Sequence, residues 1–187
     1  MTRRTTISIA MAAAFAAMSA TTALADGNAR TFSTKLIGYN ETPLTINSGG
    51  KGSFAASVNK DGTAISYTLS YRDLSAEVTQ AHIHFGRPAL TGQIVLFLCF
   101  NPALVAQPLG VPLPQTCPPA PATVSGTLTA ADVSPRANQG IDASTTGFAE
   151  MIKAMREGAA YANVHSVNFP TGEIRGAIGP GDDEEND

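Results

Sequence analysis

The sequence contains no tryptophan, only two cysteines and few charged side chains. Charged residues make up 14% of the 187 positions and aromatic residues 6%, whereas soluble chains usually carry about 25% charged residues. Glycine (17) and proline (12) are frequent instead. A chain this poor in charge and this rich in turn-forming residues is not a coiled coil or a long helical bundle, and its length is that of one domain.

Basic side chains form no long stripe along the sequence. The chain holds 12 Lys and Arg against 15 Asp and Glu, a formal charge of −3. Residues 26–181 balance at 10 basic and 10 acidic side chains, and five acids lie within residues 182–187. Because a nucleic-acid binder needs a basic stripe that releases counterions, we exclude nucleic acid as a partner. Residues 182–187 are expected to form a disordered acidic tail.

Residues 1–25 have the pattern of a secretory signal peptide. Arg3 and Arg4 precede an apolar stretch, and Ala-Leu-Ala at 23–25 supplies a cleavage motif before Asp26. The alternative is a membrane anchor, but a span needs about 20 apolar residues and this stretch is shorter. We therefore expect a periplasmic or secreted product without a membrane span, whose folded domain covers residues 26–181.

The two cysteines belong to the exported region, where an oxidising compartment favours pairing. Cys99 and Cys117 flank a proline-rich segment that is typical of a loop. We expect a disulfide between them. The alternative is a thiolate pair that binds Cu(I) or Zn, but the C-x₂-C spacing that marks such sites is missing.

Alternation of apolar and polar residues predicts antiparallel strands over most of the chain after residue 30. Residues 52–58 and 64–71 flank an Asn-Lys-Asp-Gly turn and predict a hairpin. Residues 93–98 are almost all apolar, which is typical of a central strand buried on both faces. Residues 122–130 alternate again and predict a further strand.

One amphipathic helix is expected at residues 145–157. Ser144 can cap its start and Gly158 can end it. A single helix in a β-rich chain is typical of a crossover segment that packs on the core. Its apolar face comprises Phe148, Met151, Ile152 and Met155.

The three histidines of the chain lie in two predicted strands. His82 and His84 are two residues apart, so they share the face opposite their apolar neighbours. In the second strand His165 shares the polar face with Asn163 and Tyr161. If the two strands are neighbours, all three histidines meet on one surface.

A His-x-His pair with a third histidine from another strand is the donor set of zinc and copper sites. Glu173 could serve as a fourth ligand, or as an outer carboxylate that fixes an imidazole tautomer. Metal binding requires neutral imidazoles, so affinity is expected to fall below about pH 6.5. The alternative is that the histidines only bond to Glu173, Asn163 or Ser166. For Arg175 we expect a surface ion pair with Glu173 rather than an anion site.

Five segments resemble the CHRD domain, a module described in chordin and found singly in exported bacterial proteins. The resemblance spans about residues 31–179 and implies an immunoglobulin-like antiparallel β-sandwich located outside the cytoplasm. With the helix predicted above, the expected fold is a Greek-key β-sandwich with one short crossover helix. The His-x-His pair is also similar to the copper ligands of copper,zinc superoxide dismutases, but three histidines are too few for that two-metal site. The matching segments are residues 36–43 (L-x-G-x-x-E-x-P), 49–52 (the glycine-rich step), 81–86 (A-H-I-H-x-G), 160–166 (the segment ending N-V-H-S) and 170–176 (P-x-G-E-I-R-G).

These patterns together predict an exported CHRD-domain binding module with a copper or zinc site on the sheet surface. The expected ligands are His82, His84 and His165, with Glu173 in support. Asn163, Tyr161 and Arg175 would surround them. The first alternative is a mononuclear copper oxidoreductase similar to superoxide dismutase, and the second is a metal-free domain that binds a cell-surface or matrix protein. No G-x-S-x-G, phosphate-loop or dinucleotide motif is present, so hydrolase and nucleotide-binding functions are not predicted.

Overall fold

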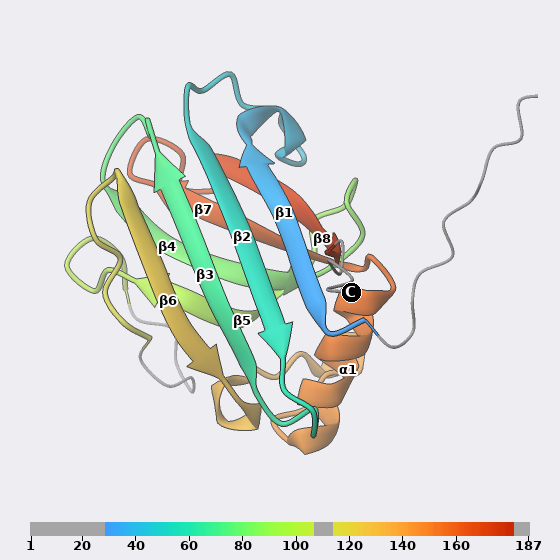
Figure 1. The fold of residues 1–187 in the computed structure, drawn as a ribbon. Coiled ribbons are helices and arrows are strands. Elements are labelled where there is room, and N and C mark those ends of the chain that lie inside the picture. The colour runs from blue at the N-terminus through green and yellow to red at the C-terminus, as the bar shows by residue number, and fades with distance from the viewer. Residues whose placement is uncertain (1–28, 107–113, 182–187) are drawn as a thin grey trace, which may run out of the picture.

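A computed structural model of the chain describes residues 29–106 and 114–181 (Figure 1). The predicted signal peptide and acidic tail lie outside these residues. The single α-helix of the described residues is α1 (Thr145–Arg156), and three short 3₁₀ turns are η1 (Gly38–Asn40), η2 (Ala130–Asp132) and η3 (Ala137–Gln139). The strands are β1 (Thr31–Ile37), β2 (Lys51–Val58), β3 (Ile65–Arg72), β4 (Val78–Phe85), β5 (Gln93–Phe100), β6 (Ala122–Leu128), β7 (Ala160–Ser166) and β8 (Ile174–Pro180).

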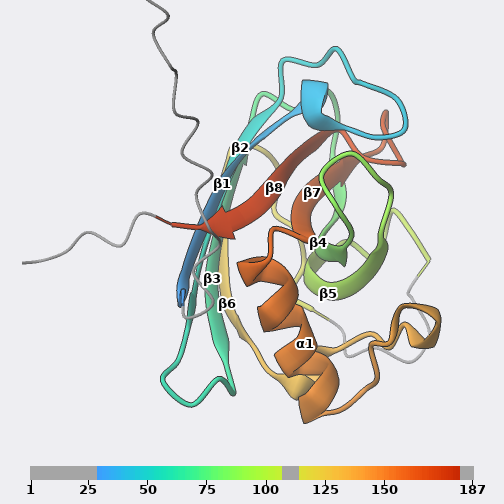
Figure 2. The same cartoon turned by 90° about the vertical axis from the view of Figure 1, so that its right-hand side faces the viewer.

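The eight strands form one antiparallel sheet in the order β5-β4-β7-β8-β1-β2-β3-β6. Pairing of β1 with β8 joins two groups of four strands, which face each other as two layers (Figure 2). The sheet curls so far that an isolated bridge links Leu96 of β5 to Val133, just beyond β6. The prediction of an all-β antiparallel fold with one helix is confirmed. The immunoglobulin-like sandwich is not confirmed, because the described strands form a single, nearly barrel-like sheet.

The predicted hairpin is β2–β3. Val58 pairs with Ile65, and Gly62 takes a positive φ of 68° in the turn between them, which glycine adopts without a steric penalty. The side-chain oxygen of Asn59 accepts hydrogen bonds from the backbone N–H groups of Thr63 and Ala64. The turn chemistry read from the sequence therefore sets the register of this hairpin.

Strand β5 is buried as predicted, but it is an edge strand and not a central one. Its residues 95–100 are all buried. The segment after β6 covers the free edge: Ser134 donates its backbone N–H to the Val95 carbonyl, and Arg136 Nε donates to the Ile94 carbonyl. An edge strand covered in this way has the same apolar composition as a central strand, which is why the pattern alone misplaces it.

Helix α1 closes one end of the two layers (Figure 2). Ser144 caps its start by accepting from the Thr146 N–H, and Gly158 follows its end with a φ of 64°. All four residues of the predicted apolar face are buried. The predicted helix and its caps are thus confirmed, and the helix seals the core between the layers.

The predicted disulfide between Cys99 and Cys117 is present. It ties the end of β5 to the segment that leads into β6. Among the described residues, no helix is both long and apolar enough to cross a membrane.

Candidate metal centre

Neighbouring strands β4 and β7 supply the three histidines. His82 and His84 alternate with core residues along β4, and His165 lies on the same face of β7. In the antiparallel register His82 opposes Asn163, and Gln80 opposes His165. One donor nitrogen of each histidine lies within 4.8 Å of the donor nitrogens of the other two. The structure therefore brings together the three side chains that strand parity places on one face.

This face is not an exposed surface. The exposed fractions are 0% for His82, 7% for His84 and 6% for His165. The turn after β7 reaches His165 through Pro170, and the segment between β4 and β5 reaches His84 through Gly92. Because these loops cover the polar face, the prediction of a site on the sheet surface is wrong: the histidines form a buried cluster.

Two backbone carbonyls fix the tautomers of His84 and His165. Nδ1 of His84 lies 3.0 Å from the Gly92 oxygen, and Nδ1 of His165 lies 2.9 Å from the Pro170 oxygen. A carbonyl only accepts, so each Nδ1 carries the proton and each Nε2 carries the lone pair. A lone pair on one nitrogen and a bonded N–H on the other is the arrangement found in metal-ligating histidines.

His82 lies at the centre of the cluster. Its Nδ1 is 3.1 Å from Nε2 of His84 and 3.1 Å from the side-chain oxygen of Asn163. Its Nε2 is buried without a hydrogen-bond partner among the described residues, and the same is true of Nε2 of His165. A buried polar atom without a partner costs about 1–3 kcal/mol, so the fold holds these two nitrogens at an energetic cost.

Burial keeps the three imidazoles neutral. Desolvation lowers the pKa of His82 well below its usual 6.5, and the neighbouring His165 and His84 lower it further. Desolvation also lowers the pKa of His84 to about 4 and lowers that of His165. Neutral imidazoles are the form that binds metal, so at neutral pH the three rings have the protonation state that a metal site requires. The decline in affinity expected below about pH 6.5 therefore moves to lower pH.

Tyr161 and Arg175 form a stack beside the cluster. The Tyr161 ring lies parallel to the His84 ring, with 4.5 Å between centroids and 11° between planes, and Cζ of Arg175 lies 3.4 Å from the Tyr161 ring centroid. Arg175 is 2% exposed and donates to the backbone oxygens of Arg87 and Leu90, and also to Thr42 Oγ1. The predicted surface ion pair with Glu173 is wrong, because Arg175 is buried and anchors the loop after β4.

Glu173 does not join the histidine cluster. Its buried carboxylate accepts hydrogen bonds from the hydroxyls of Ser48, Ser75 and Ser166 and from the Ser75 backbone N–H. The residue precedes β8, so strand alternation does not place it beside Arg175. Neither predicted role, as a fourth ligand or as an outer acceptor for an imidazole, matches these contacts. Glu173 instead ties the turns at that end of the sheet together.

Glu41 is a buried carboxylate on the other side of Asn163 from His82, and the sequence patterns assigned it no role. It is 6% exposed, and its Oε1 has no hydrogen-bond partner among the described residues. Burial raises its pKa to about 7, although the guanidinium of Arg175 and the side chain of Asn163 oppose the rise. Gly172 packs against it so closely that a Cβ there would fall 2.5 Å from Oε1. The side chain of Asn163 hydrogen-bonds to Glu41 and also lies 3.1 Å from Nδ1 of His82. The sequence did contain a signal for this residue, because Glu41 is the glutamate of the L-x-G-x-x-E-x-P motif at residues 36–43.

The fold and the cluster define a small all-β domain with a candidate metal centre in the polar face of its sheet. The family model of the CHRD domain matches residues 32–178, most of the chain, and that range includes every residue of the cluster. The chain therefore belongs to the CHRD domain family. Neither a curated protein nor a solved structure matches it.

Proposed function

We propose that this chain is an exported CHRD-domain binding module that holds one copper or zinc ion through His82, His84 and His165. The observation that carries the proposal is the convergence of one ring nitrogen from each histidine within 4.8 Å, together with Nε2 atoms of His82 and His165 that are buried without a partner among the described residues. Three imidazoles are a donor set that suits both ions. The disulfide and the signal-like residues 1–25 support export.

The lone pair of His82 lies on its Nε2. Asn163 Oδ1 faces Nδ1 of His82 at 3.1 Å, and an amide oxygen only accepts, so Nδ1 carries the proton and Nε2 is the nitrogen left to bind an ion. The alternative role, in which the histidines only hydrogen-bond to their neighbours, accounts for the Asn163 contact. It leaves Nε2 of His82 and Nε2 of His165 without a partner in the part of the chain that the structure describes.

Burial favours binding over catalysis. An oxidoreductase needs an open coordination position that its substrate can reach. His82 has no exposed surface. His84 borders a small surface pocket together with Gly92, Gln93, Ile94 and Arg136. The enclosed cluster therefore supports a site that stabilises the fold or stores metal.

The test is the metal content of the protein purified without affinity tags or chelators. We expect about one equivalent of copper or zinc per chain, and none in a variant with His82, His84 and His165 all changed to Ala. Glu173→Gln is the matched control, since its carboxylate lies outside the cluster, and it should keep the metal. Wild-type protein that takes up no copper or zinc, even after dialysis against either ion, would reject the proposal.

A further inference from the structure

A second surface of the molecule has a different chemistry. The outward side chains of β1, β2, β3 and β6 are short and mostly hydroxylic, and we call this surface the hydroxyl face. Hydroxyls bond across it, with Ser70 and Thr123 at 2.9 Å and Thr68 and Ser125 at 3.1 Å. Its cross-strand rows are Lys35, Ser53, Ser70 and Thr123; Ser33, Ala55, Thr68 and Ser125; and Thr31, Ser57, Ser66 and Thr127.

Charge on the hydroxyl face is of one sign. The four strands contain Lys35, Lys51 and Arg72 and no Asp or Glu, although the whole chain carries a net negative charge. The nearest acid along the chain is Asp73, which pairs with Arg72 at 2.5 Å. Both side chains of that pair are more than half exposed, so the pair contributes little energy. Asp73 offsets the charge of Arg72, whereas Lys35 and Lys51 have no acidic partner among the described residues, so the face keeps a net positive charge.

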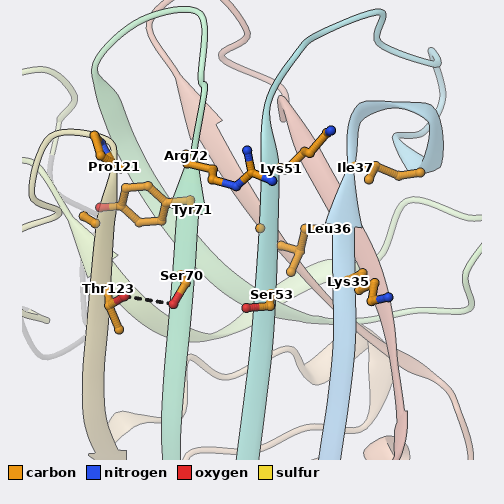
Figure 3. A pocket seen from close by; sticks show the side chains of 12 residues that line it. Lys35, Leu36, Ile37, Lys51, Ser53, Ser70, Tyr71, Arg72, Pro121 and Thr123 are labelled. Atoms are coloured by element: carbon orange, nitrogen blue, oxygen red, sulfur yellow. Dashed lines mark hydrogen bonds between the residues drawn. The ribbon is translucent and has the colours of Figure 1, made fainter.

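Two of these cations oppose each other directly in the sheet. Lys51 is the cross-strand partner of Arg72, and Figure 3 shows the Arg72 side chain reaching across to β2 while the Lys51 side chain extends away from it toward β1. Lys35 is the diagonal neighbour of Lys51, because Lys51 pairs with Ile37. Like charges directly opposite each other destabilise a sheet. The register places Lys35, Lys51 and Arg72 at neighbouring positions of three adjacent strands, so this end of the face concentrates positive charge and points to an anionic ligand.

The cations border a groove that runs across four strands. The groove has a volume of about 640 Å³, and its hydroxyl lining comes from Ser53, Ser70 and Thr123 (Figure 3). The aromatic residues of these strands, Phe32, Phe54, Tyr67 and Tyr71, are all buried. Single-stranded nucleic acids bind by stacking bases on exposed aromatic rings, so this groove does not suit them. Hydroxyls beside cations match a polymer that carries both hydroxyl and acidic groups.

We propose that the hydroxyl face binds an acidic polysaccharide. Lys35, Lys51 and Arg72 would form ion pairs with its carboxylates, and the Ser and Thr hydroxyls would hydrogen-bond to its sugar hydroxyls. This site lies on the opposite layer from the histidine cluster and does not depend on a metal. An exported protein meets such polymers in cell walls and matrices. Charge complementarity and the hydroxyl rows select this ligand class.

The test measures binding of the purified protein to polygalacturonate, with dextran as the neutral polymer. We expect salt-sensitive binding to polygalacturonate and none to dextran. Lys51→Ser and Arg72→Ser should each raise the Kd about two- to fivefold, as expected for an exposed ion pair, and the triple variant with Lys35→Ser should raise it more. Lys60→Ser, in the exposed turn between β2 and β3, is the matched control and should bind as wild type.

A second readout separates binding from folding. Because Lys51 opposes Arg72, Lys51→Ser should raise the melting temperature of the free protein by about 1–3 °C at low salt while weakening binding. Polyglutamate that binds as tightly as polygalacturonate would overturn the proposal, because the face would then recognise charge alone. Single-stranded DNA that binds more tightly than polygalacturonate would also overturn it, because the preferred ligand would then be a nucleic acid. Binding seen only after deletion of residues 182–187 would assign the face to the chain's own acidic tail and would also overturn it.

Discussion

The side-chain oxygen of Asn163 lies 3.1 Å from Nδ1 of His82, the imidazole at the centre of the cluster. Asn163 is also the cross-strand partner of both His82 and Arg175. It therefore connects the candidate ligands on one side with the buried Arg175 and Glu41 on the other. Groups that orient a ligand in this way usually affect metal affinity strongly.

Asn163→Ala should weaken zinc binding about 10- to 100-fold, the loss typical when a group that orients a ligand is removed. The reason is that His82 would lose the contact that holds its ring. Isothermal titration of zinc into the metal-free protein measures the effect. Asn47→Ala, at an exposed position, is the matched control. An unchanged affinity for Asn163→Ala would show that Asn163 does not orient the site.

Zinc affinity should stay constant from pH 7.5 to below 6.5 and then fall as the pH approaches 4. Burial lowers the pKa of all three histidines, that of His84 to about 4, so protons compete with the metal only in this lower range. Competition with a chromophoric chelator across this range gives the affinity at each pH. A tenfold loss already between pH 7.5 and 6.5 would mean that the imidazoles are solvated and not buried.

The metal-free protein should lose stability as the pH falls from 7 to 5. A histidine with a lowered folded-state pKa binds fewer protons when folded than when unfolded, so it destabilises the fold below its unfolded pKa of about 6.5. Glu41, with a pKa raised to about 7 from 4.5, acts in the opposite direction: it binds its proton more readily when folded, so it favours the fold as the pH falls through 7. The three histidines together outweigh the one carboxyl.

Glu41→Gln isolates the carboxyl, because it removes the contribution that opposes the histidines. The loss of stability between pH 7 and 5, measured by urea denaturation, should be larger in this variant than in the wild type, by up to about 1.4 kcal/mol per pH unit. Glu150→Gln, on the exposed side of α1, should follow the wild-type curve. A smaller loss in Glu41→Gln than in the wild type would contradict the raised pKa of Glu41.

Changing Cys99 and Cys117 together to Ser should lower the free energy of unfolding by about 3 kcal/mol. The bridge closes a segment with a sequence separation of 18 residues, and loops of that length restrict the unfolded chain by about this amount. Metal stoichiometry should stay the same, because the bonded sulfurs are not the proposed ligands. Loss of the metal in this double variant at a temperature where it remains folded would favour a thiolate site.

Strand alternation was sufficient to predict the site's three histidines, because His82, His84 and His165 each follow the period of two. It could not predict what covers them. The loops that place Gly92 against His84 and Pro170 against His165 are irregular. Sequence periodicity does not predict where an irregular loop folds back onto a sheet. The sequence therefore predicted the correct face and the wrong exposure.

Residues outside the regular strands were harder to predict. Alternation placed Glu173 on the same face as Arg175, but β8 begins only at Ile174. The Glu173 carboxylate and the Arg175 guanidinium therefore have separate partners. Glu41 lies about 120 residues before Asn163 in the sequence, and only the tertiary fold brings them together. The edge position of β5 depends in the same way on a distant segment, residues 132–141, that covers it.

The most direct test of the metal site is nitrogen-15 NMR of the histidine rings during a zinc titration. The chain has only three histidines, so every ring signal belongs to the proposed cluster. We predict that the signals of all three rings change together and stop changing at one equivalent of zinc. Signals that stay unchanged, or a change confined to one or two rings, would contradict a shared three-histidine site.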